Sequence, residues 1–502
     1  MIRIGIVDIG SNSIRLVIAQ IHGNNSFSII DEVKETIRLG KDMNLKGQLN
    51  PMRIDKTISV LSFFKRLCTS QNVKHTIIVA TEAVRKAANQ TEFLNRVRNE
   101  LNMEIRVLSG KEEAYYDYFG TINSIDFSDA LLLDIGGSST ELIWVQGRQL
   151  RESISLPIGA LTLTEKFSLS HPIDENTEAE LIDFLLSYYD DIPWLKNLKN
   201  IKLIGIGGSI RNIARINQKA QDYPLDNLHN YEMTSNEVKN IYESVKHKNY
   251  SQRKKIKGLS KDRADIFLGP MASVVTLQKF VNSDELCISS SGIRDGLLYE
   301  YILHKEIPLN DVLDFSLNNH ILNFELDKIH ALKVWSLTEI LYNDLKLLID
   351  ILPSESIYKI LKTSSLLHDC GIRISYYDHH KHSFYIILNS KINGLSHKEQ
   401  IISSYVAASH RKNTLKINSE HYAKIINKND IEIIEKLSIL LRISENLDRA
   451  MNGNIHKINC SISEKEVVID ITSKNDALLE INSVLEAAPA FEKIFNKKLV
   501  IK

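Results

Sequence analysis

Two short turns in this sequence combine the residue types that bind phosphate and a divalent metal ion. Residues 8–18 read DIGSNSIRLVI, and residues 134–144 read DIGGSSTELIW. Glycine lets a backbone approach a ligand closely, and successive N–H groups with serine hydroxyls form a concave anion site. A carboxylate repels phosphate unless a cation lies between them. Asp8 and Asp134 therefore indicate Mg²⁺, which keeps waters and phosphate oxygens among its ligands.

A third glycine-rich segment, GIGGSI at residues 205–210, precedes a predicted helix whose N-terminus adds positive potential. A single turn of this kind is most often an ordinary hairpin. Here there are three, and two of them align, with Asp8 opposite Asp134 and Gly10 opposite Gly136. Three copies favour a phosphate site.

The elements around these turns indicate an α/β protein. Each turn follows an apolar run and precedes an alternating apolar stretch, the pattern of strand, tight turn and strand. The two aspartates are 126 residues apart, one domain's length, so we predict duplicated α/β domains that face each other across a cleft. Periodicity predicts further elements: strands at 75–80 and 105–110, a continuous helix over 80–101, a helix from 111, and strand, turn and helix over 201–216.

The character of the chain changes after about residue 300. Residues 310–450 carry long apolar stretches at helical spacing and few strand signals, which predicts an all-α domain. The tail alternates like strands and predicts a small α/β subdomain. We therefore predict four domains, at residues 1–124, 125–302, 303–454 and 455–502.

Composition excludes several classes of protein. The 502 residues carry a formal net charge of zero, which argues against a general nucleic-acid binder. No run reaches the roughly 20 apolar residues of a membrane helix, and the apolar N-terminus lacks the cleavage site of a signal peptide. The four cysteines are far apart in sequence and fit a reducing compartment. We expect a cytoplasmic protein with no nucleic-acid or membrane partner.

Seven stretches in the first 300 residues resemble the exopolyphosphatase and guanosine-pentaphosphate phosphohydrolase family, within the actin/hexokinase/Hsp70 superfamily. They occur in the family's order, and Ser138 and Ser209 are small departures from it. The resemblance implies two actin-like domains (RNase H-like, of the ASKHA type) around a cleft. The matching stretches are DIGSNSIRLVI (8–18), ATEAVRKA (80–87), SGKEEAYYDYFG (109–120), DIGGSSTEL (134–142), GIGGS (205–209), GLSKDRADIFLGP (258–270) and SSGIRDGLLYE (290–300).

The resemblance also implies roles for particular residues. Glu113 matches the family's proposed general base, whereas the sequence alone leaves open that Glu112 and Glu113 only complement a helix N-terminus. Asp134 and Glu141 match acidic positions that hold Mg²⁺ or water, and Asp8 is a comparable metal candidate. Phosphate contacts are expected from glycines, hydroxyls, an amide and two arginines: Ser11, Asn12, Ser13, Arg15, Arg85, Gly136, Gly137, Ser138, Gly208 and Ser209. Ser139 and Thr140 bind metal or phosphate, or form the turn.

Residues 246–263 hold eight lysines and arginines against one aspartate. A charge run is usually a solvated face. Beside a phosphate cleft it is also suited to guide a long polyanion by electrostatic steering, and both interpretations stay open.

The helical region contains His330, His368–Asp369 and Asp448, a set that resembles the HD phosphohydrolase superfamily, where such residues hold a divalent metal. Imidazole with carboxylate suits Mn²⁺, Fe²⁺ or Zn²⁺ better than Mg²⁺. His382 and His410 lie where some HD proteins place ligands for a second metal. Long members of the exopolyphosphatase family often carry this domain in degenerate form, with an architectural or dimerising role.

These observations predict an exopolyphosphatase that uses Mg²⁺ and a glutamate base to release orthophosphate from the end of inorganic polyphosphate. The alternative is removal of the 5′-phosphate from guanosine pentaphosphate. A small-molecule kinase of the same superfamily and a non-catalytic polyphosphate or alarmone sensor are two further alternatives. The resemblance also implies a homodimer.

Overall fold

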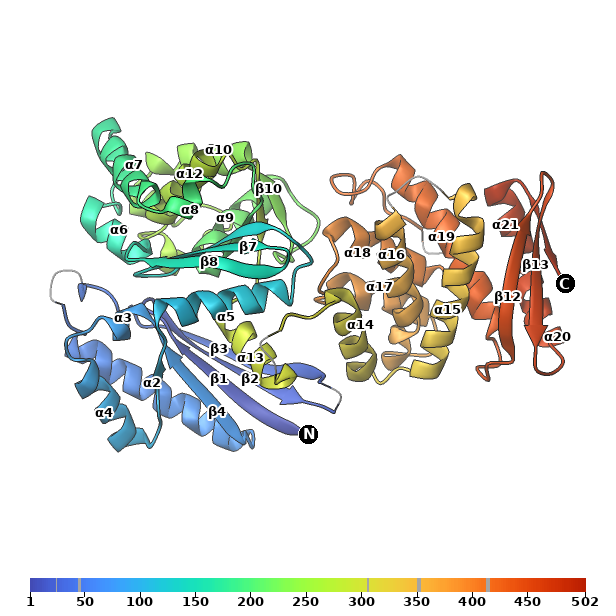
Figure 1. Cartoon of the computed structure of the whole chain (residues 1–502), viewed down its shortest axis with the longest axis horizontal. Helices are drawn as coiled ribbons and strands as arrows, with labels where there is room; N and C mark the ends of the chain where they lie inside the picture. The colour runs from blue at the N-terminus through green and yellow to red at the C-terminus, as the bar shows by residue number, and fades with distance from the viewer. Residues whose placement is uncertain (24, 44–46, 305–306, 350–353, 412–415) are drawn as a thin grey trace. The chain divides into compact units, whose positions relative to one another are not determined.

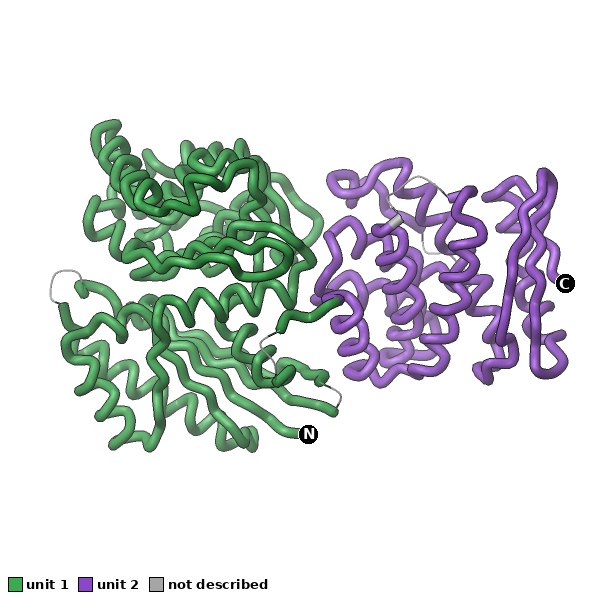
Figure 2. Tube along the Cα trace, viewed as in Figure 1, with its two compact units in different colours: residues 1–310 green, residues 311–502 purple. Residues whose placement is uncertain are grey.

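The computed structural model describes residues 1–23, 25–43, 47–304, 307–349, 354–411 and 416–502. The chain forms two compact units, residues 1–310 and 311–502 (Figure 2). The first unit contains all three glycine-rich turns. The finer division into four domains stays a prediction.

The first lobe of unit 1 is built on a five-stranded sheet in the order β3-β2-β1-β4-β5. The first three strands are antiparallel, and β4 and β5 run parallel to β1. Because successive side chains of a strand point to opposite faces, Val7 and Ile9 pack with α2 and α4, while Ile4 and Ile6 face the other way. The elements are β1 (Ile2–Ile9), β2 (Ser13–Ile21), β3 (Phe27–Thr36), α2 (Pro51–Ser70), β4 (His75–Ala80), α3 (Glu82–Arg85), α4 (Gln90–Leu101) and β5 (Arg106–Val107).

The second lobe repeats this plan on a six-stranded sheet, β10-β11-β9-β6-β7-β8. Strands β6, β7 and β8 are antiparallel like β1 to β3, β9 and β11 are parallel to β6, and β10 is an added antiparallel edge. Its elements are β6 (Ala130–Ile135), β7 (Thr140–Gln146), β8 (Gln149–Leu156), α6 (Ala160–Phe167), α7 (Glu175–Asp190), α8 (Pro193–Lys196), β9 (Leu203–Ile206), α9 (Gly207–Ala220), β10 (Glu232–Thr234), α10 (Ser235–Lys246), α11 (Tyr250–Arg253), η1 (Lys261–Arg263), α12 (Leu268–Val281) and β11 (Glu285–Ile288).

Helices α5 (Gly110–Ile122) and α13 (Ile293–Leu303) connect the two lobes, and α5 lies between the two sheets (Figure 1). The chain leaves the first lobe through α5 and returns to it through α13, whose Leu297 and Ile302 pack with Ile4 and Ile6 of β1. The two helices cross closely. A Cβ on Gly120 would lie 2.4 Å from the Gly292 carbonyl oxygen, and one on Gly296 would lie 2.1 Å from that of Tyr116.

The continuous helix predicted over 80–101 is wrong, because the chain breaks between α3 and α4. At the break, the Asn89 side chain accepts a hydrogen bond from the Leu49 N–H at 2.8 Å and donates one to the Leu49 carbonyl at 3.0 Å. An asparagine that pairs with a distant backbone segment competes with helix continuation. The strand predicted at 105–110 is also shorter than expected, because Ser109 caps α5 through a capping box with Glu112.

The second unit is a helical bundle followed by a small sheet. Strands β12, β13 and β14 form that sheet, with β14 parallel to β13. None of the described helices is long and apolar enough to cross a membrane. The elements are α14 (Val312–Asn323), α15 (Lys328–Leu345), η2 (Lys346–Leu348), α16 (Ser354–Leu367), η3 (Cys370–Arg373), α17 (His379–Asn389), α18 (His397–Ala408), α19 (Lys428–Leu447), β12 (Ile455–Ile462), β13 (Glu466–Ser473), α20 (Leu478–Leu485), α21 (Ala488–Phe495) and β14 (Lys498–Ile501).

Candidate active site

The two aligned turns have the same local structure. The Gly10 N–H donates to the Ser13 carbonyl at 3.1 Å, and the Gly136 N–H donates to the Ser139 carbonyl at 3.0 Å. The turns also touch, since a Cβ on Gly137 would lie 2.8 Å from Cβ of Ser11. The sequence repeat is therefore a structural repeat whose two copies meet.

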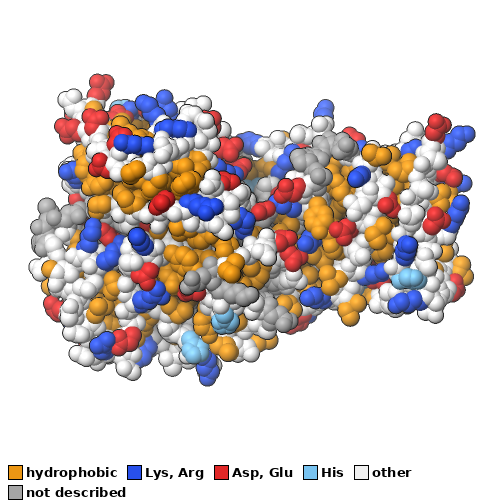
Figure 3. Space-filling view, in the orientation of Figure 1, with side chains coloured by type: hydrophobic (Ala, Val, Ile, Leu, Met, Phe, Trp, Pro, Cys, Tyr) orange, Lys and Arg blue, Asp and Glu red, His pale blue; other side chains and the backbone are white. Residues whose placement is uncertain are grey.

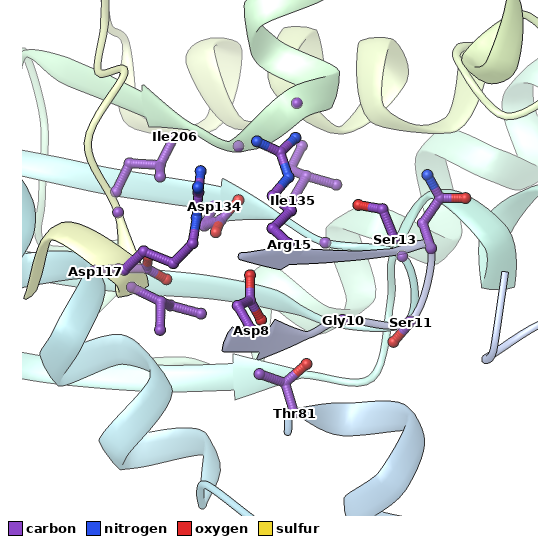
Figure 4. A pocket seen from close by; sticks show the side chains of 18 of the residues that line it. Asp8, Gly10, Ser11, Ser13, Arg15, Thr81, Asp117, Asp134, Ile135 and Ile206 are labelled. Atoms are coloured by element: carbon purple, nitrogen blue, oxygen red, sulfur yellow. The ribbon is translucent and has the colours of Figure 1, made fainter. Parts of the chain in front are cut away.

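A pocket opens where these turns meet the β9–α9 turn and the segment before α13 (Figure 4). Ten of the residues predicted to bind metal or phosphate, or to catalyse, line this pocket: Asp8, Ser11, Asn12, Ser13, Arg15, Glu113, Asp134, Gly136, Gly137 and Gly208. Ser139 lines it as well, whereas Thr140 donates to the Ile158 carbonyl at 2.5 Å and serves the turn.

Carboxylates from both lobes surround this pocket, and several of their buried oxygens lack the hydrogen-bond or cation partners that buried carboxylates need. Asp8 Oδ1 and Asp134 Oδ1 are buried and accept no hydrogen bond, and the same is true of both oxygens of Asp117. Burial raises the pKa of all three carboxyls, most strongly at Asp117, where Asp134 and Glu141 add to the effect. A divalent cation would satisfy these oxygens and favour their ionised form, so the residues present fit Mg²⁺.

Sequence reasoning missed Asp117. It lies one helical turn after Glu113 on α5, and its side chain points toward the same space as Asp8 and Asp134 (Figure 4). The available signal was the i, i+4 spacing of two acids on one helix, since residues four apart share a face.

Glu113 is buried in the first turn of α5 and receives a hydrogen bond from Arg85 Nη1 at 3.0 Å. Burial raises the pKa of Glu113 to about 8, against the opposing effect of Arg85, and Asp134 and Asp8 raise it further. Arg85 also donates to Glu82 and does not line the pocket. In this structure Arg85 holds the Glu113 carboxylate, and its contact with phosphate stays a prediction.

Three further residues predicted for the site lie behind its lining. Glu141 is 1% exposed and accepts a hydrogen bond from Ser155 Oγ at 2.7 Å. Burial raises its pKa well above the usual range, and Glu113 raises it further. Ser209 Oγ accepts from Arg263 Nη1 at 2.9 Å, and Ser138 does not line the pocket either. These side chains support the lining and do not form it.

Three arginines that sequence reasoning did not assign to the site line it together with Arg15: Arg211, Arg263 and Arg294. Arg211 donates to the Ser290 carbonyl at 3.1 Å, and Arg263 lies so close to Gly208 that a Cβ there would be 2.5 Å from Nη2. Burial lowers the pKa of Arg211 to about 9, and Arg15 and Arg294 contribute to that shift. Clustered guanidinium groups fit a phosphate chain.

The basic run at 246–263 divides into structural and exposed members. Arg253 is buried and donates to the His171 carbonyl at 3.1 Å, Lys246 pairs with Glu178 at 3.0 Å, and Arg263 belongs to the pocket. Four lysines remain exposed: Lys254, Lys255, Lys257 and Lys261. On the face shown in Figure 3, cationic and anionic side chains are interspersed, as expected of a chain with no net charge.

In the second unit, the structure brings together His330, His368 and Asp369. Asp448 differs from the prediction, because its Oδ2 lies 2.8 Å from His330 Nδ1, on the far side of that ring. Glu445, one turn earlier on α19, takes the place expected for Asp448, with Oε2 3.0 Å from His330 Nε2. His410 joins this cluster with His379, and His382 is not among the described residues grouped there.

Comparison with known proteins is consistent with this architecture. Residues 17–305 match the model described as the Ppx/GppA phosphatase family, and residues 312–488 match Ppx/GppA phosphatase, domain III. A Ppx/GppA family protein of Aquifex aeolicus has a solved structure with a TM-score of 0.53 and 32% identity, covering 60% of this chain and 98% of that one. An exopolyphosphatase structure from Cytophaga hutchinsonii, at 24% identity, has a TM-score of 0.56 over 61% and 99% of the two chains. The first unit thus has the duplicated two-lobe α/β fold that the sequence predicted.

Two curated relatives differ in how much of their length is matched. The bifunctional 3-dehydroquinate synthase/phosphatase of Fusobacterium nucleatum is 29% identical over 60% of this chain, but this chain spans only 46% of that protein. The guanosine-5′-triphosphate,3′-diphosphate pyrophosphatase of Vibrio vulnificus is 24% identical over 83% of this chain and 82% of its own length.

Proposed function

The chain belongs to the Ppx/GppA phosphatase family, and on that basis we propose that it releases orthophosphate from the end of inorganic polyphosphate in a Mg²⁺-dependent hydrolysis. One observation carries the proposal: a single pocket holds unsatisfied buried carboxylate oxygens from both lobes and four arginines. The carboxylates provide oxygen ligands for a cation, and the arginines provide hydrogen-bond donors for a phosphate chain.

In this proposal, Glu113 orients a water molecule and accepts its proton as the oxygen attacks the terminal phosphorus and the bridging P–O bond breaks. Asp8 and Asp134 would hold Mg²⁺, with Asp117 beside them. When bound, Mg²⁺ neutralises charge on the phosphoryl oxygens. The N–H groups of the turns and the arginines hold the phosphates in line, while Arg85 keeps the Glu113 carboxylate in place.

Guanosine pentaphosphate is a second candidate substrate, because relatives named for it match most of this chain and most of their own length. It presents a terminal phosphoanhydride to the same turns. The exposed lysines between 254 and 261 support polyphosphate, since a long anion gains more from an extended basic surface than a nucleotide does. We further propose a cytoplasmic location and a homodimeric state.

The test is phosphate release from long-chain polyphosphate with Mg²⁺, run beside guanosine pentaphosphate and ATP. Glu113→Gln is expected to lower the rate by roughly 10²–10⁴-fold, the usual contribution of a general base. Glu112→Gln is the matched control. Glu112 neighbours Glu113 but caps α5 outside the pocket, so this variant should keep the wild-type rate.

Each alternative gives a different result. Phosphate release from guanosine pentaphosphate alone would show that this nucleotide, and not polyphosphate, is the substrate. ADP formation that depends on an added alcohol would indicate a kinase. Binding of either polyphosphate or guanosine pentaphosphate without release would indicate a sensor. Equal rates for wild type and Glu113→Gln would refute the assigned base.

A further inference from the structure

Residues 37–40 lie between β3 and α2 and do not line the pocket, yet they contact the first two glycine-rich turns. The Gly40 N–H donates to the Ser11 carbonyl at 2.8 Å. A Cβ on Gly40 would lie 2.7 Å from Ser138 Oγ and 2.9 Å from Cβ of Ser11, so no side chain fits between this segment and the turns. The segment is therefore packed tightly against both turns.

Arg38, in this segment, has a backbone conformation that a residue with a side chain rarely adopts. Its φ of 59° lies in the left-handed region. The Arg38 N–H donates to the Asn12 carbonyl at 2.8 Å, and the Arg38 carbonyl accepts from Arg53 Nη1 at 2.5 Å. These two bonds hold the conformation in place, as is typical of sites where a side chain has a specific task. An arginine at a position that favours glycine indicates that its side chain is needed.

The Arg38 side chain reaches from the first lobe to the second. Its Nη1 donates to Asp265 Oδ2 at 2.5 Å and its Nη2 donates to Asp265 Oδ1 at 2.8 Å, which is a bidentate ion pair. The same Nη2 donates to the Asp262 carbonyl at 2.8 Å. The Arg38 and Asp265 side chains are 23% and 22% exposed, so water reaches the pair only in part. Lys34 Nζ and Thr36 Oγ1 of β3 also donate to Asp262 Oδ2, at 2.8 and 3.2 Å.

Between these two aspartates, the chain carries Arg263, which lines the pocket. Arg263 Nη1 donates to Ser209 Oγ at 2.9 Å, and a Cβ on Gly208 would lie 2.5 Å from Arg263 Nη2. Both contacts with the third glycine-rich turn depend on where η1 lies. Arg38 therefore joins the first turn, through its backbone, to the third turn, through the segment that carries Arg263.

We propose that Arg38 is a positioning residue of the phosphate site, which holds η1 against the first lobe and so keeps Arg263 directed into the pocket. This inference rests on the function proposed above for the same pocket. Arg38 does not line the pocket, so its effect on phosphate passes through Arg263. Lysine cannot replace it, because a single ammonium group lacks the planar fork that makes the bidentate pair with Asp265 and the bond to the Asp262 carbonyl together.

The first test does not depend on any substrate. Hydrogen–deuterium exchange of the full-length chain reports how firmly residues 258–270, which include η1, are held. Arg38→Gln should increase exchange in peptides from this segment. Arg98→Gln, which breaks an exposed bidentate pair with Glu104 away from the pocket, is the matched control and should leave that exchange unchanged. Unchanged exchange over 258–270 in Arg38→Gln would overturn the positioning role, whatever the pocket binds.

Arg38→Gly separates positioning from folding. Glycine adopts the left-handed conformation readily, so this variant removes the backbone strain together with the side chain. We expect its thermal midpoint to be at least as high as that of Arg38→Gln, with increased exchange over 258–270 in both variants. Increased exchange across the whole of the first unit in both variants would show that Arg38 serves folding, and would overturn the positioning role.

The second test measures tripolyphosphate binding with Mg²⁺ by calorimetry, in full-length chains that carry Glu113→Gln so that hydrolysis is slow. Adding Arg38→Gln should weaken binding roughly 10–100-fold, the range expected when a charge-assisted hydrogen bond to phosphate is lost. Adding Arg98→Gln should leave the affinity unchanged. Equal affinities with and without Arg38→Gln would overturn the inference. A parent chain that binds no tripolyphosphate would refute the proposed function, and the exchange experiment would still decide the role of Arg38.

The third test asks whether the effect passes through Arg263. Arg263→Gln should weaken tripolyphosphate binding by itself, and Arg38→Gln should add little to that loss, because the two substitutions act on one contact. Additive losses would overturn the route through Arg263. In chains that keep Glu113, Arg38→Gln should raise KM for polyphosphate more than it lowers kcat. A lower kcat with an unchanged KM would indicate only a smaller folded fraction, and would overturn the positioning role.

Discussion

The carboxylates of the pocket are the residues whose energetics depend most on what is bound. Asp8, Glu113, Asp117 and Asp134 have raised pKa values, about 8 for Glu113, and burial is the largest cause for each. Protonation of these carboxyls, and binding of a cation to them, therefore change the free energy of unfolding of the first unit.

This coupling has a definite sign. A carboxyl whose folded pKa is raised keeps its proton while the unfolded chain has lost it, so the free energy of unfolding falls as pH rises from about 4 through the folded pKa. Without divalent ions, the thermal midpoint of the chain should fall between about pH 5.5 and about pH 8.5. Mg²⁺ favours the ionised carboxylates and should reduce that fall. Thermal unfolding with chelator and with Mg²⁺ measures both.

Asp117→Asn provides the variant for this experiment, because it removes a carboxyl whose pKa burial raises well above its usual range, without adding volume. It should flatten the chelator profile and raise the Mg²⁺ concentration needed for phosphate release. Asp183→Asn, on the exposed face of α7, is the control. Identical profiles for Asp117→Asn and wild type would contradict the coupling.

Among the elements, the crossing of α5 and α13 positions the site most directly. Helix α5 carries Glu113 and Asp117, and the segment that starts α13 lines the pocket. Gly120 and Gly296 leave no space for a side chain where the two helices meet. Their separation therefore sets how far the base lies from the second lobe.

Gly120→Ala should force the helices apart, since its Cβ would lie 2.4 Å from a backbone oxygen that cannot move alone. Overpacking of this kind costs roughly 1–3 kcal/mol. We expect a lower thermal midpoint together with a lower rate of polyphosphate hydrolysis. Gly23→Ala is the matched control, because nothing lies within 4 Å of its added Cβ. An unchanged rate in Gly120→Ala would show that this crossing does not position the base.

The same element shows where sequence reasoning succeeds and where it stops. The DIG turns were predictable because glycine and serine at fixed spacing have a local backbone meaning, and the two copies confirmed one another. Arg211 and Arg294 enter the pocket only through tertiary packing, which no local pattern reports, whereas Asp117 had a local signal in its i, i+4 spacing from Glu113. The pairing of Arg85 with Glu113 was not predictable for the same reason as the two arginines, since Glu113 comes beside Arg85 only when α5 packs beside α3.

In the second unit, the sequence identified most of the clustered residues but did not predict which carboxylate faces which nitrogen of His330. Spacing along the chain identified His330, His368 and Asp369, yet it could not distinguish Glu445 from Asp448, which lie one turn apart on the end of α19. Only the helix rotation decides which carboxylate faces Nε2 of His330 and which faces Nδ1.

At the scale of the whole molecule, the two units are expected to work separately. A chain of residues 1–310 contains every residue that lines the pocket, and the Aquifex aeolicus structure matches 60% of this chain over 98% of its own length. We expect this chain to fold and to hydrolyse polyphosphate at a rate of the same order as the full chain. It should elute as a monomer and the full chain as a dimer, measured by light scattering. Loss of hydrolysis in a folded 1–310 chain would contradict the separation.

The return of α13 to the first sheet also has a consequence for synthesis on the ribosome. Ile4, Ile6 and Val79 are among the first apolar residues to emerge, but their partners Leu297, Leu298 and Ile302 are translated only after the entire second lobe. The part of this cluster that α13 covers therefore stays exposed until α13 is made, although Leu108 and Tyr116 of the same cluster are translated earlier. The first lobe therefore completes its core only after the second lobe has been translated.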